Sequence, residues 1–261
     1  MNHRKAIAGL SATASFLYLG YQYKKEILRF VYEQKLKFHP GNGNNYAVIN
    51  AGSNPDTILT GKTIGYLGSS VTFGAASGHV SFVEYIARRN RGKYVKEAVS
   101  GTTLVDEGED SYIRRMKKMD PDTKFDAFVV QLSTNDATQN KKLGTISQSG
   151  LYDTKTITGA MEYIISYVKN TWHCPVLFYT NARYESEAYA AMVQRLKELQ
   201  KKHVIGVIDL YTDDAFNDIT DEQRNLYMAD PIHPVKAGYL QWWTPEIEKQ
   251  MISYLNSLYN E

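Results

Sequence analysis

The sequence holds two short segments whose residue types suit nucleophilic catalysis. The first is Gly68-Ser69-Ser70, in which a serine that follows a glycine can expose its hydroxyl group in a tight turn. The second is Asp230-Pro231-Ile232-His233. A carboxylate three residues before a histidine can hold the imidazole through Nδ1, which leaves Nε2 free to accept a proton from a serine hydroxyl. Serine-glycine turns also occur without any function, so the first segment alone fits both interpretations.

Two other segments carry groups that can bind a negatively charged oxygen atom. Gly101 allows close approach of the backbone, so its N–H group can point at a ligand, although a loop glycine needs no such role. The side-chain amide of Asn135 can donate a hydrogen bond to charge that develops on a carbonyl oxygen, as an oxyanion hole requires. The same segment also fits a turn in which Asn135 and Asp136 cap the local backbone.

Other polar residues allow more than one interpretation. His79 follows the first segment closely and is a rival base, or else a substrate-loop or surface residue. Arg183 can bind an anionic group of a substrate or pair with Glu185 or Glu187. Because the histidines other than His233 lack the spacing of metal ligands, we expect no metal site, and no motif indicates a cofactor.

The scaffold that positions these residues is predicted by short apolar runs that alternate with helical patterns. We expect strands over residues 63–67, 94–99, 125–132, 175–179 and 204–210. We expect helices over residues 81–89, 112–119, 158–169, 185–202 and 234–258, with Pro245 as a point of interruption. This order predicts an α/β fold with a mostly parallel sheet and helices on both faces. Ligands of such sheets bind beyond the carboxyl ends of the strands, which is where the candidate residues lie.

The order and placement of these segments resemble those of the SGNH hydrolase superfamily, also called the GDSL esterase and lipase family. Its four sequence blocks correspond to Gly68-Ser69-Ser70, Gly101, Ser133-Thr134-Asn135-Asp136 and Asp230-Pro231-Ile232-His233. The resemblance extends from about residue 62 to the C-terminal helix, and it implies a three-layer α/β/α, flavodoxin-like fold.

The resemblance also implies a role for each block. Ser70 would be the nucleophile, His233 the general base, and Asp230 the residue that orients His233. The N–H groups of Ser70 and Gly101 and the side chain of Asn135 would form the oxyanion hole.

Two positions depart from the family pattern. Ser69 stands where the family's Gly-Asp-Ser block has its acidic residue, so Ser69 is a rival nucleophile, although the position within the block favours Ser70. The third block begins with Ser133 where the family has glycine. Neither change removes a group of the triad, because the acid of the triad would be Asp230.

Composition excludes several classes of protein. A chain of 261 residues with 43% apolar and 22% charged residues is typical of a globular protein with a large core. Thirty Lys and Arg against 28 Asp and Glu leave a net charge of +2, which gives no reason to expect a nucleic-acid partner. The single cysteine, Cys174, excludes an intramolecular disulfide and predicts a buried packing residue.

The N-terminal part of the chain differs from the rest. Residues 6–23 contain no charged side chain, a length at the short end of the roughly 17–25 residues that span a bilayer. An uncleaved signal anchor, a cleaved signal peptide and a buried hydrophobic helix all fit this pattern, and we favour the anchor. We expect residues 1–23 to be a membrane segment, residues 24–49 a helical stalk and linker, and residues 50–261 the hydrolase domain. That domain is expected outside the cytoplasm, either anchored or secreted.

These expectations favour hydrolysis of short acyl esters, particularly O-acetyl groups on carbohydrate, through an acyl-enzyme. Acyl transfer to another alcohol, hydrolysis of a lysophospholipid and a non-catalytic binding module are the alternatives. The expected partner is therefore a small-molecule or carbohydrate ester. Some of the 20 tyrosines, such as Tyr184 and Tyr189, are candidates for stacking on sugar rings, although most are expected to be ordinary core and surface residues.

Overall fold

The computed structural model describes residue 24, residues 26–28 and residues 30–258, so the predicted membrane segment lies outside the described residues. The chain divides into two units, of which the smaller ends at His39 and the larger begins at Pro40. In the smaller unit residues 30–37 are helical. None of the helices in the described part of the chain is long and apolar enough to cross a membrane.

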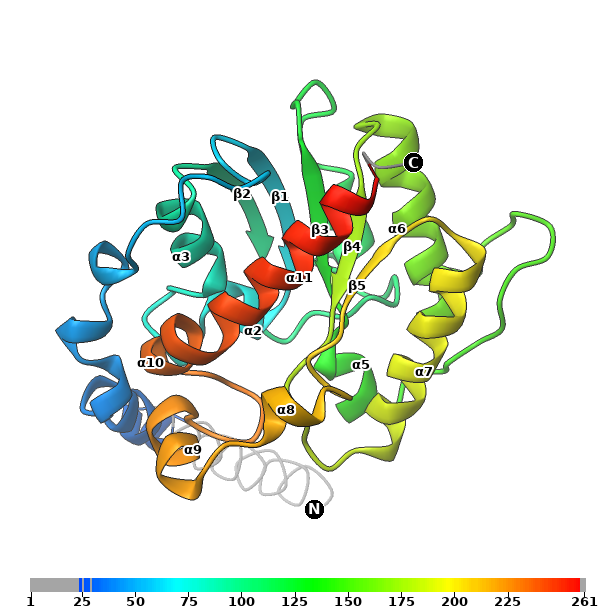
Figure 1. Ribbon diagram of the computed structural model, residues 1–261. Helices are drawn as coiled ribbons and strands as arrows, with labels where there is room; N and C mark the ends of the chain where they lie inside the picture. The colour runs from blue at the N-terminus through cyan, green and yellow to red at the C-terminus, as the bar shows by residue number, and fades with distance from the viewer. Residues whose placement is uncertain (1–23, 25, 29, 259–261) are drawn as a thin grey trace, which may run out of the picture. The chain divides into compact units, whose positions relative to one another are not determined.

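The larger unit is built around a parallel sheet of five strands. They are β1 (Thr63–Gly68), β2 (Lys93–Ala98), β3 (Ala127–Gln131), β4 (Val176–Tyr179) and β5 (Gly206–Ile208), arranged in the order β2-β1-β3-β4-β5. All four pairings are parallel, so the carboxyl ends of the strands meet at one edge, the lower edge in Figure 1. The apolar strands β3 and β4 are buried throughout, as expected for the middle of such a sheet.

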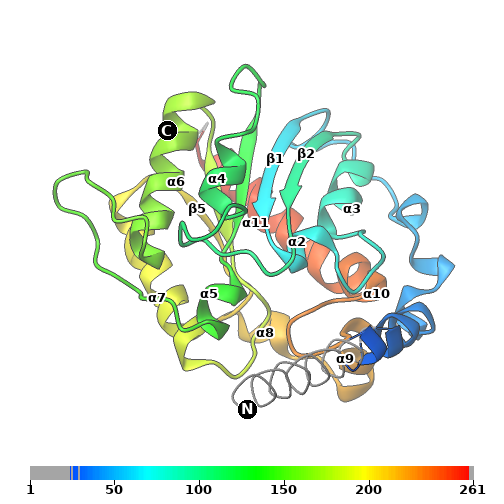
Figure 2. The same ribbon diagram turned by 180° about the vertical axis from the view of Figure 1, so that it is seen from behind.

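Helices cover both faces of this sheet, which confirms the predicted three-layer α/β/α fold. One face carries α4 (Tyr112–Met116), α6 (Ile157–Thr171) and α7 (Glu187–Lys202), which lie in front of the sheet in Figure 2. The other face carries α3 (Phe82–Arg89) and α11 (Thr244–Ser257). Phe128 and Val129 are neighbours in β3 and belong to the two different cores, because successive side chains of a strand point to opposite faces.

The longer helices begin where the sequence supplies a capping side chain. Ser81 and Glu84 form a capping box at the start of α3. The hydroxyl groups of Thr156 and Ser186 accept backbone N–H groups at the starts of α6 and α7. The predicted C-terminal helix is α10 (Lys236–Gly238), a π-helical turn η4 (Tyr239–Trp243) and α11 in succession. The π turn lies just before Pro245, whose ring cannot fit a regular helix interior.

Short elements at the carboxyl edge of the sheet complete the unit. They are α2 (Ser70–Phe73), α5 (Thr134–Thr138), α8 (Asp214–Asn217) and α9 (Asp221–Tyr227). Such helices span about one or two turns, so no hydrophobic period reveals them in the sequence. Two of the candidate catalytic residues lie in these short helices, Ser70 in α2 and Asn135 in α5.

Three 3-10 turns connect Pro40 to the first strand. They are η1 (Pro40–Asn42), η2 (Asn44–Tyr46) and η3 (Val48–Asn50). The Tyr85 hydroxyl donates to the carbonyl oxygen of Tyr46 at 2.6 Å, and the Asn42 amide donates to that of Ala76 at 2.9 Å. Residues 40–49 therefore pack against the rest of the larger unit, to which they belong.

Candidate active site

Ser70, His233 and Asp230 form one chain of hydrogen bonds at the carboxyl edge of the sheet. Ser70 is the first residue of α2, directly after β1, and His233 lies in the loop before α10. His233 Nε2 lies 2.8 Å from Ser70 Oγ, and His233 Nδ1 lies 2.9 Å from both carboxylate oxygens of Asp230. This geometry suits transfer of the Ser70 proton to His233.

The loop itself orients the acidic residue. Asp230 Oδ1 accepts the backbone N–H groups of Ile232 and His233, each at 2.9 Å. Partial burial by itself would raise the pKa of Asp230. The hydrogen bond and charge of His233, together with the two backbone N–H groups, outweigh burial and lower this pKa to about 2. Asp230 is therefore ionised at neutral pH and can stabilise a protonated His233.

The turn that presents Ser70 is fixed by a polar residue at the end of β3. Gln131 Oε1 accepts the N–H of Ser69 at 2.8 Å and the hydroxyl of Thr72 at 2.8 Å. A side chain at Gly68 would collide with Thr72 and Gln131, so the glycine is required for this close approach. Ser69 is fully buried, whereas Ser70 carries the contact with His233.

Three donors that can form an oxyanion hole follow three neighbouring strands. Ser70 follows β1, Gly101 lies in the loop after β2, and Asn135 lies in α5 after β3. Within the described residues, the N–H groups of Ser70 and Gly101 have no hydrogen-bond acceptor, which leaves both for a ligand. Asn135 Nδ2 donates to the carbonyl oxygen of Thr102 at 2.9 Å, so one amide hydrogen orients the side chain and the other remains.

Two polar residues beside Asn135 take part in holding these loops. Ser133, not Asp136, caps the helix, because its hydroxyl accepts the N–H groups of Asn135 and Asp136. The buried carboxylate of Asp136 instead accepts the N–H groups of Leu104 at 2.8 Å and Val105 at 3.1 Å. Asp136 thereby ties the loop after β2 to the loop after β3.

Two further candidates have other positions in the structure. His79 is exposed, has a backbone φ of 68°, and its ring lies 4.4 Å from that of Phe73. His233, not His79, contacts the nucleophile candidate. Cys174 is buried in the core as predicted, and burial raises the pKa of its thiol to about 12, far above the range of a reactive thiolate.

Arg183 pairs with a residue that the sequence pattern did not indicate. Its guanidinium group lies 2.6 Å from Asp214 and donates to the carbonyl oxygen of Tyr211 at 3.1 Å. The pairing with Glu185 or Glu187, one of the two alternatives that the sequence allowed, does not occur among the described residues. Arg183 thus connects the loop after β4 to the start of α8.

Tyr189 cannot stack on a sugar ring, in contrast to the expectation from the sequence. It is fully buried, its hydroxyl group donates to the carbonyl oxygen of Leu132 at 3.0 Å, and its hydroxyl oxygen accepts the N–H of Asn181 at 2.8 Å. Tyr184 and Tyr211 are half-buried. These two rings, with centroids 6.3 Å apart, are the aromatic surface that a ligand can reach here.

A hollow of about 610 Å³ adjoins the triad. Asp230 and Pro231 line it together with Arg183, Tyr184 and Arg224. A neighbouring hollow of about 710 Å³ shares the last three residues and adds Tyr211. The surface beside Asp230 is thus open and carries charged and aromatic side chains.

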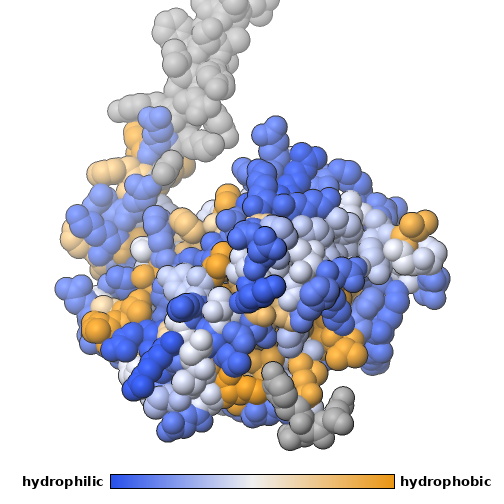
Figure 3. Space-filling model, turned by 90° about the horizontal axis from the view of Figure 1, so that it is seen from above, coloured by the Kyte–Doolittle hydropathy of each residue, from blue (hydrophilic) through white to orange (hydrophobic). Residues whose placement is uncertain are grey.

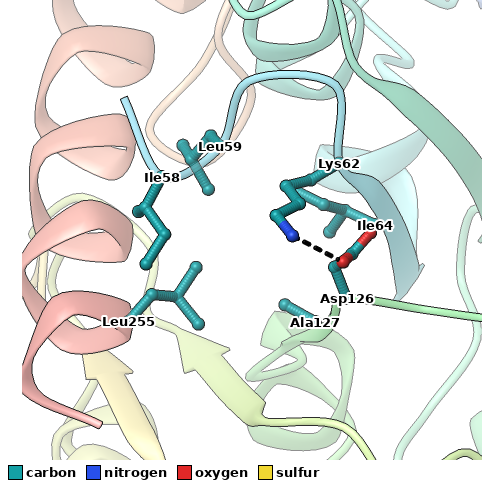
Figure 4. Close-up of a pocket in the computed structure, with 7 residues that line it drawn as sticks. All are labelled: Ile58, Leu59, Lys62, Ile64, Asp126, Ala127 and Leu255. Carbon is teal, nitrogen blue, oxygen red and sulfur yellow. Dashed lines mark hydrogen bonds and ion pairs between the residues drawn. The ribbon is translucent and has the colours of Figure 1, made fainter. Parts of the chain in front are cut away.

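Another hollow lies at the opposite, amino end of the strands. It is lined by Ile58, Leu59, Lys62, Ile64, Asp126, Ala127 and Leu255, and Figure 4 shows the ion pair of Lys62 and Asp126, 2.9 Å long, at its rim. Its volume of about 10 Å³ is the space of one water molecule. Figure 3 looks down on this end of the molecule, where hydrophilic side chains surround separate apolar patches. This hollow is too small for an ester substrate and lies far from the triad.

Several residues that shape the site belong to no sequence motif and could not be predicted from the sequence. Thr102 acts through a backbone carbonyl, and Arg115 donates to the carbonyl oxygens of Gly68 and Glu97. Gln131 does leave a signal, because it is a polar residue at the end of an otherwise apolar strand. Among the described residues, no group of three or more histidine, cysteine, aspartate or glutamate side chains is placed to hold a metal ion.

The fold is a three-layer α/β/α arrangement around a parallel sheet, and the candidate residues lie at the carboxyl edge of that sheet. The chain belongs to the GDSL-like Lipase/Acylhydrolase family, whose model matches residues 66–240. That range begins in β1 and ends after the loop that holds Asp230 and His233. Family membership supports an ester hydrolase. No curated protein sequence matches the chain.

Solved structures share this fold at low sequence identity. A protein from Lactobacillus plantarum is 20% identical, with a TM-score of 0.63 over 76% of this chain and 98% of the other. A member of the lipolytic protein G-D-S-L family from Veillonella parvula is 17% identical, with a TM-score of 0.52 over 72% and 96%. An acetylxylan esterase from Geobacillus stearothermophilus is 13% identical, with a TM-score of 0.52 over 75% and 96%. These likenesses establish the fold.

Proposed function

We propose that the protein is a serine esterase that hydrolyses short acyl esters through an acyl-enzyme. The observation that carries this proposal is the continuous hydrogen-bonded chain from Ser70 Oγ through His233 to Asp230. The N–H groups of Ser70 and Gly101 and the side-chain amide of Asn135 would form the oxyanion hole that acyl transfer also requires.

The reaction follows from these positions. His233 Nε2 takes the proton of Ser70 while Oγ attacks the ester carbonyl carbon, and the negative charge that forms on the carbonyl oxygen is held by the oxyanion donors. His233 then gives its proton to the leaving alcohol as the C–O bond breaks. A water molecule loses a proton to His233 and attacks the carbonyl carbon of the acyl-enzyme. As the bond from that carbon to Ser70 Oγ breaks, His233 returns the proton to Oγ, and the acid is released. Asp230 remains ionised throughout.

We propose O-acetyl groups on carbohydrate as the substrate class. The hollow beside Asp230 is open and lined by Arg183, Tyr184 and Arg224, which suits a polar sugar better than a long acyl chain. The half-buried rings of Tyr184 and Tyr211 offer apolar faces of the kind on which sugar rings stack. One structure with the same fold is an acetylxylan esterase.

A substrate panel tests this function. Purified protein is given p-nitrophenyl esters of increasing chain length and acetylated oligosaccharides, with Ser70→Ala as the matched inactive control. We expect acetyl esters to be cleaved fastest, acetate to be released from the oligosaccharides, and all activity to be lost in the control. Faster cleavage of long-chain esters would contradict the substrate class. Equal activity of the control would contradict the mechanism.

We also propose that the chain associates with a membrane through its N-terminal part. The smaller unit supports this, because Ile27, Phe30 and Val31 lie about one turn apart on its helix and are 45%, 60% and 57% exposed. Lys35 and Lys37 lie on the same helix and can contact anionic lipid headgroups. Flotation of the full chain with vesicles of phosphatidylglycerol and phosphatidylcholine tests the proposal. We expect co-flotation, and recovery of all the protein in the bottom fraction would contradict it.

A further inference from the structure

Arg115 is a buried cation at the place where the ends of β1 and β2 meet. Only 4% of this residue is exposed. Its guanidinium group donates to the carbonyl oxygens of Glu97 at 2.7 Å and Gly68 at 2.8 Å, and to the hydroxyl of Thr102 at 3.0 Å. A further bond of 3.0 Å reaches the carbonyl oxygen of Asp110.

Arg115 is bound mainly by backbone rather than by acidic groups. The nearest carboxylate, that of Glu97, lies 3.8 Å away and is 41% exposed. A buried arginine that serves stability alone is normally matched by a close carboxylate, because an unpaired buried charge is costly. Here the planar fork of donors is used to hold carbonyl oxygens from two strand ends and one loop in a fixed arrangement.

Each proposed oxyanion donor is linked to a residue that Arg115 binds, either through one or two residues of the chain or through one hydrogen bond. Gly68 precedes Ser70 by two residues in the nucleophile turn. Thr102 follows Gly101 directly, and its hydroxyl, which accepts from Arg115, donates to the carbonyl oxygen of Val99 at 2.7 Å. The carbonyl oxygen of Thr102 in turn accepts the side-chain amide of Asn135 at 2.9 Å.

We propose that Arg115 is a positioning residue that aligns the three donors of the oxyanion hole across β2, β1 and β3. This inference rests on the proposed esterase function. It assigns the alignment of the hole to one side chain outside the four sequence blocks. A misaligned donor weakens binding of the charged intermediate more than binding of the neutral ester, so loss of Arg115 lowers kcat and leaves KM nearly unchanged.

Steady-state kinetics of two Arg115 variants with p-nitrophenyl acetate test this role. We expect Arg115→Gln to lower kcat by about 100-fold, the effect typical of one lost oxyanion donor, with KM within about threefold. Arg115→Lys, which keeps the charge and some donors, should recover about a tenth of the wild-type kcat. The rate of labelling by a fluorophosphonate, which passes through a similar charged species, should fall in parallel with kcat.

Arg195→Gln is the matched control. Arg195 also holds a carbonyl oxygen, that of Gly144 at 2.6 Å, and a threonine hydroxyl, that of Thr158 at 2.8 Å, but it lies in α7, away from the triad. We expect Arg195→Gln to lower the melting temperature without lowering kcat. If folded Arg115→Gln keeps kcat within threefold of wild type, or if Arg195→Gln loses as much kcat, Arg115 has no positioning role.

Thr102→Val decides the matter if Arg115→Gln does not fold. This variant removes the hydroxyl that Arg115 holds and keeps the carbonyl that holds Asn135, so kcat should fall about tenfold at unchanged KM. An unchanged kcat would overturn the inference. Failure of the esterase function itself looks different, because wild type would then neither hydrolyse the ester nor react with the fluorophosphonate.

Discussion

We expect Asp230 to determine which nitrogen of His233 carries the proton, because its carboxylate lies beside Nδ1. In Asp230→Asn, the amide oxygen can take the place of Oδ1 and keep the N–H groups of Ile232 and His233, and the NH2 group then takes the place of Oδ2 beside Nδ1. The NH2 group favours the imidazole tautomer that carries its proton on Nε2, and this tautomer cannot accept the proton of Ser70. We expect kcat to fall by about 10⁴-fold with an unchanged circular dichroism spectrum. Steady-state hydrolysis of p-nitrophenyl acetate measures this, and a loss below tenfold would show that Asp230 does not orient the base.

The same carboxylate makes stability depend on pH in the acid range. The pKa of Asp230 in the folded protein, about 2, is below its ordinary value of 3.8, so the unfolded chain binds this proton more tightly. The contribution of Asp230 is therefore complete above the ordinary pKa and is lost as pH falls from about 4 through 2. Urea unfolding of wild type and Asp230→Asn between pH 5 and pH 2 should give curves that converge at low pH. A constant difference would contradict the assigned pKa.

At the residue scale, local contacts were predictable and distant ones were not. The contact of Asp230 with His233 joins residues three positions apart, so its spacing is visible in the sequence. The contact of Ser70 with His233 joins residues 163 positions apart, and only the resemblance to a family predicted it. Tyr189 was a candidate for stacking on a sugar ring but is buried, because its exposure depends on contacts with Leu132 and Asn181 that no local pattern encodes.

The loop between β2 and α4 needs a glycine for its backbone conformation rather than for space. Gly101 has φ of +83°, and no atom lies within 4 Å of where a Cβ would be; Gly61, before β1, has φ of +72° and the same open surroundings. Alanine at either position should cost about 1–2 kcal/mol of folding free energy. Only Gly101→Ala should also lower kcat, by up to about 100-fold, because the strained loop turns its N–H away from the oxyanion. Melting temperatures and kcat of both variants provide the comparison, and equal kcat values would remove Gly101 from the hole.

Helices and strands were predictable where they are long enough for a hydrophobic pattern to repeat. The buried strand β4 is apolar throughout and the buried strand β3 is apolar up to its last residue, Gln131. The helices α3, α6 and α7 have capping residues and amphipathic patterns, so all five elements are visible in the sequence. The helices α2 and α5, of four and five residues, are too short for a pattern, yet they carry Ser70 and Asn135. The site therefore lies on elements that are hard to predict. Its location was predicted instead from the carboxyl ends of the strands.

At the scale of the molecule, residues 40–49 contribute to the stability of the larger unit. A fragment that starts at residue 50 would lose the carbonyl partner of the buried Tyr85 hydroxyl and the side chain of Asn42, which accepts the N–H of Lys236 at 3.1 Å. We expect it to be about 2 kcal/mol less stable in urea than a fragment that starts at residue 40. Tyr85→Phe should cost less in the shorter fragment, where the hydroxyl has already lost its partner. Equal midpoints for the two fragments would contradict this account.

The parallel sheet brings together segments that are far apart in the chain. β1, β2 and β3 are neighbours, so the residues after them meet at one edge although they come from positions 70, 101 and 135. The C-terminal loop adds Asp230 and His233 to the same edge. The account of the whole molecule depends on one assignment, that Ser70 is the group which attacks the ester.

Labelling with a fluorophosphonate, followed by peptide mapping by mass spectrometry, tests that assignment most directly. Wild type, Ser69→Ala and Ser70→Ala are compared, since Ser69 is the neighbouring hydroxyl and is fully buried. We predict one adduct, on Ser70, in wild type and in Ser69→Ala, and no adduct in Ser70→Ala. An adduct on Ser69, an adduct that persists in Ser70→Ala, or no adduct on folded wild-type protein would contradict the account.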